Sequence, residues 1–268
     1  IDTLFVTHSN YQYLVDNKTY DRVLEGYKNN YKDNGKDFLE LNLANGDVTY
    51  SKDNTTIKST QAHILVLKIY IYIFSKLIRN NKLYLDSPIN DIRNSFHEFS
   101  KNEKFTVFRI KQYISYVDLL IRYYKYLLKK LGVKEVYQAT YYDPSGLSIN
   151  SAASQLGIKT YCAQHGGQSR NNPAFGQWTN IPLKGYSMLP NIFLCWDSWS
   201  ANTINEWSDN NFHLSKVVSY QWPNLWKSGV IKYSGSDKLN QISEGRFNIL
   251  YTMQPSIGAP PLMILESI

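Results

Sequence analysis

Short apolar runs alternate with longer amphipathic stretches along the chain, which is the pattern of an α/β protein. The apolar runs are short enough for buried strands, which we predict over Leu4–Thr7, Phe38–Leu43, Val133–Tyr141, Ile158–Ala163, Asn191–Trp196, Lys216–Tyr220 and Phe247–Thr252. Apolar residues at helical spacing predict helices over Tyr20–Tyr31, Ser59–Arg79, Phe105–Leu131, Leu147–Leu156 and Ser198–Trp207. The polar segments 46–56 and 166–190 are predicted loops.

The helix predicted over Phe105–Leu131 has the most regular pattern, and Gly132 ends it as a residue that tolerates the left-handed conformation. Its second face carries lysines and tyrosines, which we interpret as a solvated surface in preference to a membrane-binding one. The most apolar window, 62–78, is short and interrupted by polar residues. We therefore predict a buried helix there and no membrane span.

A compact β-α-β unit is predicted between Val133 and Ala163, with Gly157 as the C-cap of its helix. Two strands joined by a helix pair in parallel through a right-handed crossover, and ligands of such sheets bind beyond the carboxyl ends of the strands. The fold class predicted is therefore α/β, with a Rossmann-like parallel sheet and helices on both faces. The segments Tyr142-Asp143-Pro144-Ser145 and Gln164-His165-Gly166-Gly167 are expected to share one rim of this sheet.

The composition adds a basic surface, because the formal net charge is +7. Such a surface attracts phosphate in nucleic acid, in lipid headgroups or in nucleotide-activated substrates. The lysines and arginines form no dense block, and no zinc-ligand spacing or aromatic RNA-binding signature occurs, so we predict no nucleic-acid partner. Both cysteines, Cys162 and Cys195, lie in apolar runs and are predicted to be buried thiols. The N-terminus does not resemble a signal peptide. Together with the two buried thiols, it favours a cytoplasmic protein.

His165 is the leading candidate for chemistry, because it follows a buried strand directly and precedes two glycines. An imidazole there can act as a general base, and Gly166 and Gly167 would let the backbone approach a ligand or adopt a positive φ. The alternative is a histidine that only closes the following loop. Asp143 ends the neighbouring strand and is a second catalytic candidate, as a base or as the group that orients His165. The alternative is an aspartate that initiates its own turn.

Further candidates are substrate-binding residues, of which His8 and Ser9 follow the first strand and should face the same rim. The full set is His8, Ser9, Gln164, Gly166, Gly167, Arg170 and Gln254. The remaining histidines have no metal-binding spacing, so no metal is predicted. The chain also has no Walker-type phosphate loop, no Gly-x-Gly-x-x-Gly and no Gly-x-Ser-x-Gly turn. These absences argue against a P-loop NTPase, a dehydrogenase and an α/β-hydrolase.

The order of these segments resembles the GT-B-fold glycosyltransferases that build bacterial capsule and lipopolysaccharide chains. The segments that carry the likeness are Gln164-His165-Gly166, Pro190–Asp197, Val217–Pro223 and Asn248–Thr252 followed by Gln254. The resemblance implies an acceptor-side domain over 1–231, a linker over 232–246 and the start of a donor-binding domain over 247–268. It also implies a chain truncated shortly after that second domain begins. One departure is Gln221-Trp222-Pro223, where a glycine before the proline is commoner.

The activity implied is metal-independent transfer of a sugar from a nucleotide-sugar donor to a glycan or lipid-linked acceptor, with no cofactor. The acceptor would lie at the inner face of the membrane, where peripheral contact is compatible with the basic surface. A His-Gly pair also resembles the teichoic-acid glycerophosphate polymerases, whose histidine is taken as the base, and that role carries over to His165 alone. Sugar-nucleotide 2-epimerases fit less well, since no Glu follows His165. A non-catalytic glycan-binding subunit is the alternative from another class, and an RNA-binding module ranks last.

Overall fold

The computed structural model describes residues 1–15, 17–43, 47–51, 56–57, 73, 106–208, 212–219, 221–229 and 231. All of them belong to one compact unit, Ile1–Ile231. Ile73 is described and is helical, but the rest of the predicted helix Ser59–Arg79 lies outside the described residues. The predicted linker 232–246 and the segment 247–268, which includes Gln254, also lie outside them.

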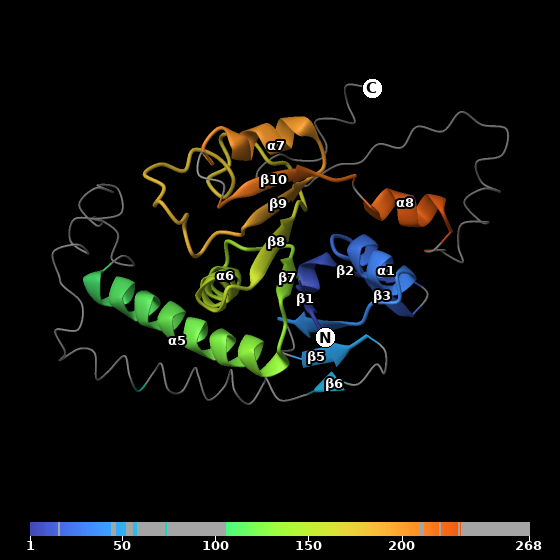
Figure 1. Cartoon of the computed structure of the whole chain (residues 1–268), viewed down its shortest axis with the longest axis horizontal. Coiled ribbons are helices and arrows are strands. Elements are labelled where there is room, and N and C mark those ends of the chain that lie inside the picture. The colour runs from blue at the N-terminus through green and yellow to red at the C-terminus, as the bar shows by residue number, and fades with distance from the viewer. Residues whose placement is uncertain are drawn as a thin grey trace, which may run out of the picture. The chain divides into compact units, whose positions relative to one another are not determined.

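An eight-stranded sheet forms the centre of this unit, in the order β10-β9-β8-β7-β1-β4-β5-β6 (Figure 1). Its strands are β1 (Thr3–Thr7), β4 (Phe38–Asn42), β5 (Asp47–Tyr50), β6 (Thr56–Ile57), β7 (Glu135–Gln138), β8 (Lys159–Ala163), β9 (Ile192–Cys195) and β10 (Leu214–Val217). From β10 to β4 every pair is parallel, whereas β5 and β6 pair antiparallel. The prediction of a Rossmann-like, largely parallel sheet is confirmed.

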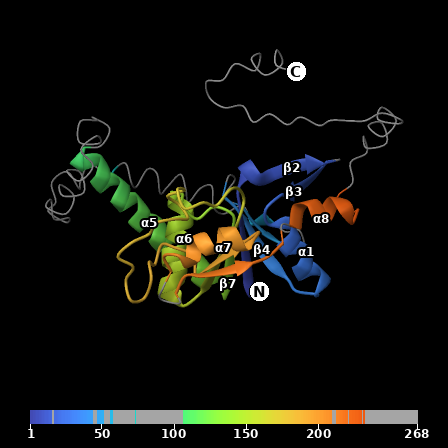
Figure 2. The ribbon, with the colours of Figure 1, turned by 90° about the horizontal axis from the view of Figure 1, so that it is seen from above.

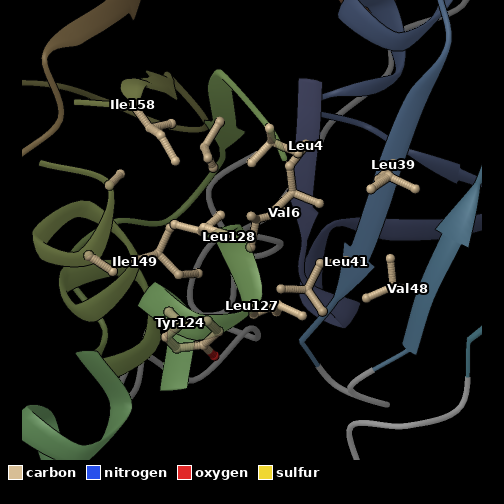
Figure 3. Packing of buried hydrophobic residues seen from close by; sticks show 14 of the residues in the cluster. Leu4, Val6, Leu39, Leu41, Val48, Tyr124, Leu127, Leu128, Ile149 and Ile158 are labelled. Atoms are coloured by element: carbon tan, nitrogen blue, oxygen red, sulfur yellow. The ribbon is translucent and has the colours of Figure 1, made fainter. Parts of the chain in front are cut away.

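Helices cover both faces of the sheet, because the strand side chains alternate between two apolar layers. Leu4 and Val6 of β1 pack against α5 (Val107–Leu131) and α6 (Pro144–Leu156), in the cluster shown in Figure 3. Phe5, between them, faces the opposite layer beside α1 (Glu25–Asp33). Figures 1 and 2 both show α5 and α6 on one side and α1 on the other. Near the β9 edge, α7 (Ser198–Asn205) packs on Phe193.

The predicted C-terminal ends of two helices are confirmed, whereas their starts differ: α5 begins at Val107 in place of Phe105, and α6 begins at Pro144 in place of Leu147. Thr106 caps the start of α5 through a hydrogen bond from the backbone N–H of Arg109, and Gly132 ends it with a φ of 66°. Gly157 ends α6 in the same way, with a φ of 69°. Within the described part of the chain, no helix has the length and apolarity that a bilayer crossing requires.

Three segments differ from the predictions. The predicted helix from Tyr20 begins only at Glu25, because residues before it form a hairpin of β2 (Gln12–Val15) and β3 (Lys18–Asp21). Asn17 supplies the positive φ, 63°, that the tight turn between these strands requires. The predicted loop 46–56 contains β5 and part of β6, and Val48 of β5 is deeply buried. The residues Gln221-Trp222-Pro223, which follow the predicted strand Lys216–Tyr220, begin helix α8 (Gln221–Lys227), whose first turn tolerates proline.

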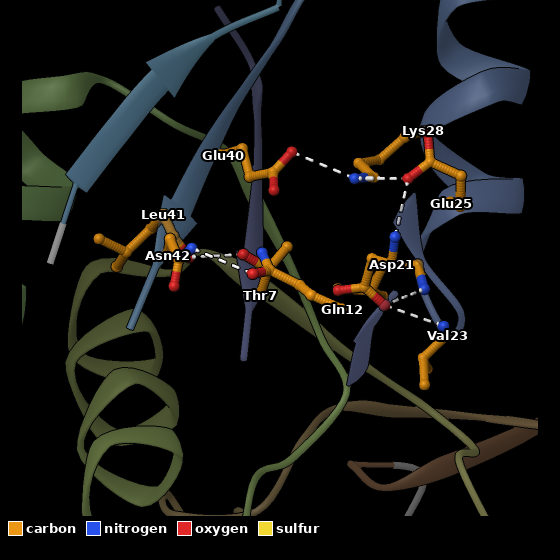
Figure 4. A network of polar contacts seen from close by, with 10 residues as sticks. Thr7, Gln12, Asp21, Val23, Glu25, Lys28, Glu40, Leu41 and Asn42 are labelled. Carbon is orange, nitrogen blue, oxygen red and sulfur yellow. Dashed lines mark hydrogen bonds and ion pairs between the residues drawn. The ribbon is translucent and has the colours of Figure 1, made fainter. Parts of the chain in front are cut away.

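A buried polar network joins α1 to the sheet (Figure 4). The Lys28 ammonium lies 2.8 Å from Glu25 and 3.2 Å from Glu40 of β4. The Glu25 carboxylate also accepts a hydrogen bond from the backbone N–H of Asp21. Asp21 in turn accepts hydrogen bonds at 2.9 Å from the backbone N–H groups of Val23 and Leu24, directly before α1. The network therefore fixes the approach of the chain to α1.

We expect Asp21→Asn to remove a loss of stability that the wild type suffers as pH rises. Burial raises the pKa of Asp21 from 3.8 to about 6, although Lys28 opposes the shift. The folded protein therefore holds a proton that the unfolded chain has released, so folding weakens as pH rises from about 4 to about 6. An asparagine keeps the acceptor for Val23 and Leu24 without the buried charge.

The measurement is urea unfolding at pH 4.5 and pH 7. From pH 4.5 to pH 7, the free energy of unfolding of the variant should rise by about 2 kcal/mol relative to that of the wild type. Asp197→Asn is the matched control, because Asp197 is an exposed carboxylate that caps α7 outside the network. If the free energies of unfolding of Asp21→Asn and the wild type differ by the same amount at both pH values, the expectation is contradicted.

Candidate functional site

The candidate site lies where the strand order of the sheet reverses. From β1 the chain passes to β4 on one side, and the later strands β7, β8, β9 and β10 follow on the other. Ligands of open parallel sheets bind outside the carboxyl ends of the strands at such a switch point. Tyr11 is the last residue of the short helix η1 (Ser9–Tyr11), which follows β1. Tyr142 follows β7, and His165 follows β8. These side chains come together there.

His165 is held between two tyrosine hydroxyls. Its Nδ1 lies 3.2 Å from the Tyr11 hydroxyl oxygen and its Nε2 lies 3.1 Å from that of Tyr142. The Phe175 ring stands edge-on at 6.5 Å from the imidazole. A hydroxyl can donate or accept, so a neutral imidazole is satisfied here in either tautomer. The two hydroxyls therefore orient the ring.

The surroundings of His165 favour its neutral form. Burial lowers the pKa of His165, and the nearby positive charge of Arg22 lowers it further. Burial also raises the pKa of Tyr142 to about 12, so its hydroxyl keeps its proton. Near pH 7 the imidazole is therefore uncharged and able to accept a proton, while Tyr142 remains a neutral hydroxyl.

Asp143 does not orient His165, contrary to one of the roles predicted for it. Its carboxylate accepts a hydrogen bond of 2.6 Å from the backbone N–H of Gly146 and caps α6, with Pro144 at the first helical position. The described structure contains no hydrogen bond between Asp143 and His165. The Asp143 carboxylate is held at the N-terminus of α6. The hydroxyls of Tyr11 and Tyr142 contact His165 in its place.

Gln164 is a positioning residue of the turn, and its side chain is 3% exposed. Its amide nitrogen donates to the Gly166 carbonyl at 2.9 Å and to the Ser200 hydroxyl of α7 at 3.2 Å. Its amide oxygen accepts from the backbone N–H of Trp196 at 2.7 Å. The side chain predicted to bind substrate is thus fully engaged inside the protein, where it ties the turn to the end of β9 and the start of α7.

Gly166 and Gly167 leave open space beside the imidazole turn. Neither has a positive φ, so that alternative of the sequence-based interpretation is wrong. A Cβ added at either position would meet no atom within 4 Å. Nothing in the described protein therefore requires glycine there, and close approach of a ligand to the backbone stays the open prediction.

The other predicted ligand-binding residues are more scattered. His8 lies at the same rim, where its Nδ1 accepts from the backbone N–H of Asn10 and its ring is 6.2 Å from that of Tyr11. Ser9 begins η1. Arg170 is exposed and forms a 3.7 Å ion pair with Glu206. It lines a separate hollow of about 830 Å³ that neither His165 nor its two tyrosines line. Among the described residues, no group of three or more His, Cys, Asp or Glu could hold a metal.

Sequence reasoning overlooked Tyr11, Phe175 and Arg22, and it gave no role to Tyr142. The chain contains 22 tyrosines, so a single one carries little information. The only available signal was position, since Tyr11 and Tyr142 follow predicted strands as closely as His8 and Asp143 do. By contrast, the prediction that both cysteines are buried thiols is confirmed, and burial raises the pKa of Cys195 to about 12.

The fold and this geometry together define a Rossmann-like α/β protein with a neutral, tyrosine-held histidine at the switch point of its sheet. No protein-family model matches the chain, and neither a curated protein nor a solved structure is found to be similar to it.

Proposed function

We propose that this chain is the acceptor-side part of a glycosyltransferase, in which His165 is the general base. The observation that carries the proposal is the uncharged, oriented imidazole at the carboxyl rim, directly beside open space at Gly166 and Gly167. Its lowered pKa suits a group that accepts a proton near neutral pH. A hydroxyl is the substrate group that such a base activates, and sugar acceptors present hydroxyls.

In the proposed reaction, an acceptor hydroxyl lies where the Tyr142 hydroxyl now meets Nε2. The acceptor oxygen attacks the anomeric carbon of a nucleotide sugar while its proton passes to Nε2. The new C–O bond forms as the bond from that carbon to the donor phosphate breaks, and the nucleotide leaves with the electron pair. Nδ1–H would donate to Tyr11, which stabilises the imidazolium that results. The site uses no metal or cofactor in this proposal.

A second candidate is transfer of a polyol phosphate, favoured by the Arg22 cation near His165. The same base would then direct an acceptor hydroxyl at phosphorus in place of carbon. Either donor is nucleotide-activated, so the reaction would belong to the cytoplasm or the inner membrane face, and the basic surface fits an acidic polymer acceptor. A non-catalytic glycan-binding subunit is the alternative without chemistry.

The test is turnover by the full-length protein with crude host glycan as acceptor. The donors are a panel of nucleoside-diphosphate sugars and a nucleoside-diphosphate glycerol. Sugar transfer from such donors releases a nucleoside diphosphate, whereas glycerophosphate transfer releases a nucleoside monophosphate, so the nucleotide formed identifies the reaction. We expect acceptor-dependent release of the diphosphate. Release of the monophosphate alone would select the second candidate, and no release from any donor would leave the glycan-binding subunit.

A further inference from the structure

Arg22 is a cation beside the candidate site that has no acidic partner among the residues the structure describes. It follows β3, and its guanidinium carbon lies 5.3 Å from the centre of the Tyr11 ring and 5.6 Å from that of Tyr13. One terminal nitrogen donates to the Tyr13 hydroxyl at 3.4 Å. Its Nε is buried and has no hydrogen-bond partner in the described structure. A buried donor left unpaired is costly, and it calls for a specific reason.

The same guanidinium lies close to His165. Both side chains contact the Tyr11 ring, which is 5.0 Å from the imidazole ring. The neighbouring Asp21 carboxylate instead accepts from the backbone N–H groups of Val23 and Leu24. Among the described residues, no carboxylate forms an ion pair with Arg22. Positive charge is therefore placed beside the proposed base, where it disfavours a protonated His165.

We propose that Arg22 binds a phosphate group of the ligand that His165 faces. A guanidinium presents N–H donors in a planar fork that matches two phosphate oxygens, and its stacking on tyrosine rings holds the fork in place. A bound phosphate would pair the Nε that now has no partner and would replace repulsion of the imidazolium with attraction. The phosphate belongs either to a nucleoside diphosphate donor or to a phosphate-containing acceptor. As a statement about substrate, this inference rests on the proposed function.

Binding is measured without turnover, by proton NMR of the His165 imidazole with inorganic phosphate as the probe. The His165→Gln variant assigns the resonance. Phosphate should raise the pKa of His165 by about half a unit or more, since an anion favours the charged ring. Arg22→Ala should raise the pKa of His165 in the absence of phosphate. It should also weaken the binding of phosphate, followed through the pKa of His165, about tenfold or more. Arg22→Lys should restore part of it, because the charge returns without the fork.

Arg122→Ala is the matched control, because Arg122 is an exposed arginine of α5 paired with Asp118. It should leave the phosphate effect unchanged. Repeating the titration with a nucleoside diphosphate and with glycerol phosphate identifies the source, which is the one bound more tightly through Arg22. A phosphate effect equal in wild type and Arg22→Ala, or none in wild type, overturns the inference. Arg22-dependent binding without turnover of any donor would instead overturn the transferase proposal alone.

Discussion

The His165→Ala variant should lose on the order of a hundredfold or more in transfer rate while keeping the wild-type fold. The imidazole is only half-buried, and its hydrogen bonds are to hydroxyls that can turn to water, so its removal costs the fold little. Its loss removes the group that takes the acceptor proton. The measurement is kcat with saturating donor, alongside thermal unfolding of each variant.

Asp143→Asn is the matched control for this prediction, because asparagine also caps a helix and keeps the hydrogen bond from Gly146. It should retain activity within a few-fold. A large loss in Asp143→Asn with little loss in His165→Ala would exchange the two assignments. The pH profile gives a second check. Because the pKa of His165 is lowered, its base form persists on acidification, and the acidic limb of kcat/KM should fall below pH 6.5.

The Gly146→Ala variant should destabilise the fold by about 2 to 3 kcal/mol. A Cβ at this position would lie 2.5 Å from the Thr140 carbonyl oxygen and 2.6 Å from the Tyr141 Cα. Both obstacles are backbone atoms, so relief requires the start of α6 to move away from the end of β7. The free energy of unfolding in urea measures the effect.

Gly166→Ala is the matched control, since its new methyl group would meet no atom within 4 Å. Its stability should stay within about 1 kcal/mol of wild type, or rise slightly because the unfolded chain loses freedom. Equal destabilisation by the two substitutions would contradict the tight contact at Gly146. A loss of ligand binding in Gly166→Ala with unchanged stability would support close approach of a ligand to this turn.

The parallel part of the fold could be predicted because its strands are buried on both faces and therefore read as continuous apolar runs. The antiparallel edge could not. Val48 of β5 is deeply buried but lies in a polar segment, and β6 is two residues long. The β2–β3 hairpin was missed for a similar reason, since Tyr13 and Leu14 are exposed and its register depends on a turn at Asn17.

The candidate site could likewise be predicted only in part. The position of His165 could be predicted because a residue just past a buried parallel strand lies at the ligand-binding rim. Its partners could not, because Tyr11 is 154 residues away in sequence and no local pattern distinguishes it from other tyrosines. Asp143 was predicted as the partner because carboxylates often orient histidines. Its carboxylate instead makes a local hydrogen bond that caps the N-terminus of α6.

The reversal of strand order also determines when neighbouring strands can pair during translation. β1 leaves the ribosome well before its neighbour β7, which begins at Glu135, more than a hundred residues later in the chain. At typical elongation rates, one edge of β1 waits roughly 10 seconds for that partner. Meanwhile Leu4, Phe5 and Val6 form an uncovered apolar strand of the kind that invites pairing with other chains. Nascent chains that end before β7 should therefore depend most on chaperones, and Tyr11 cannot meet His165 until the segment that contains β8 has emerged.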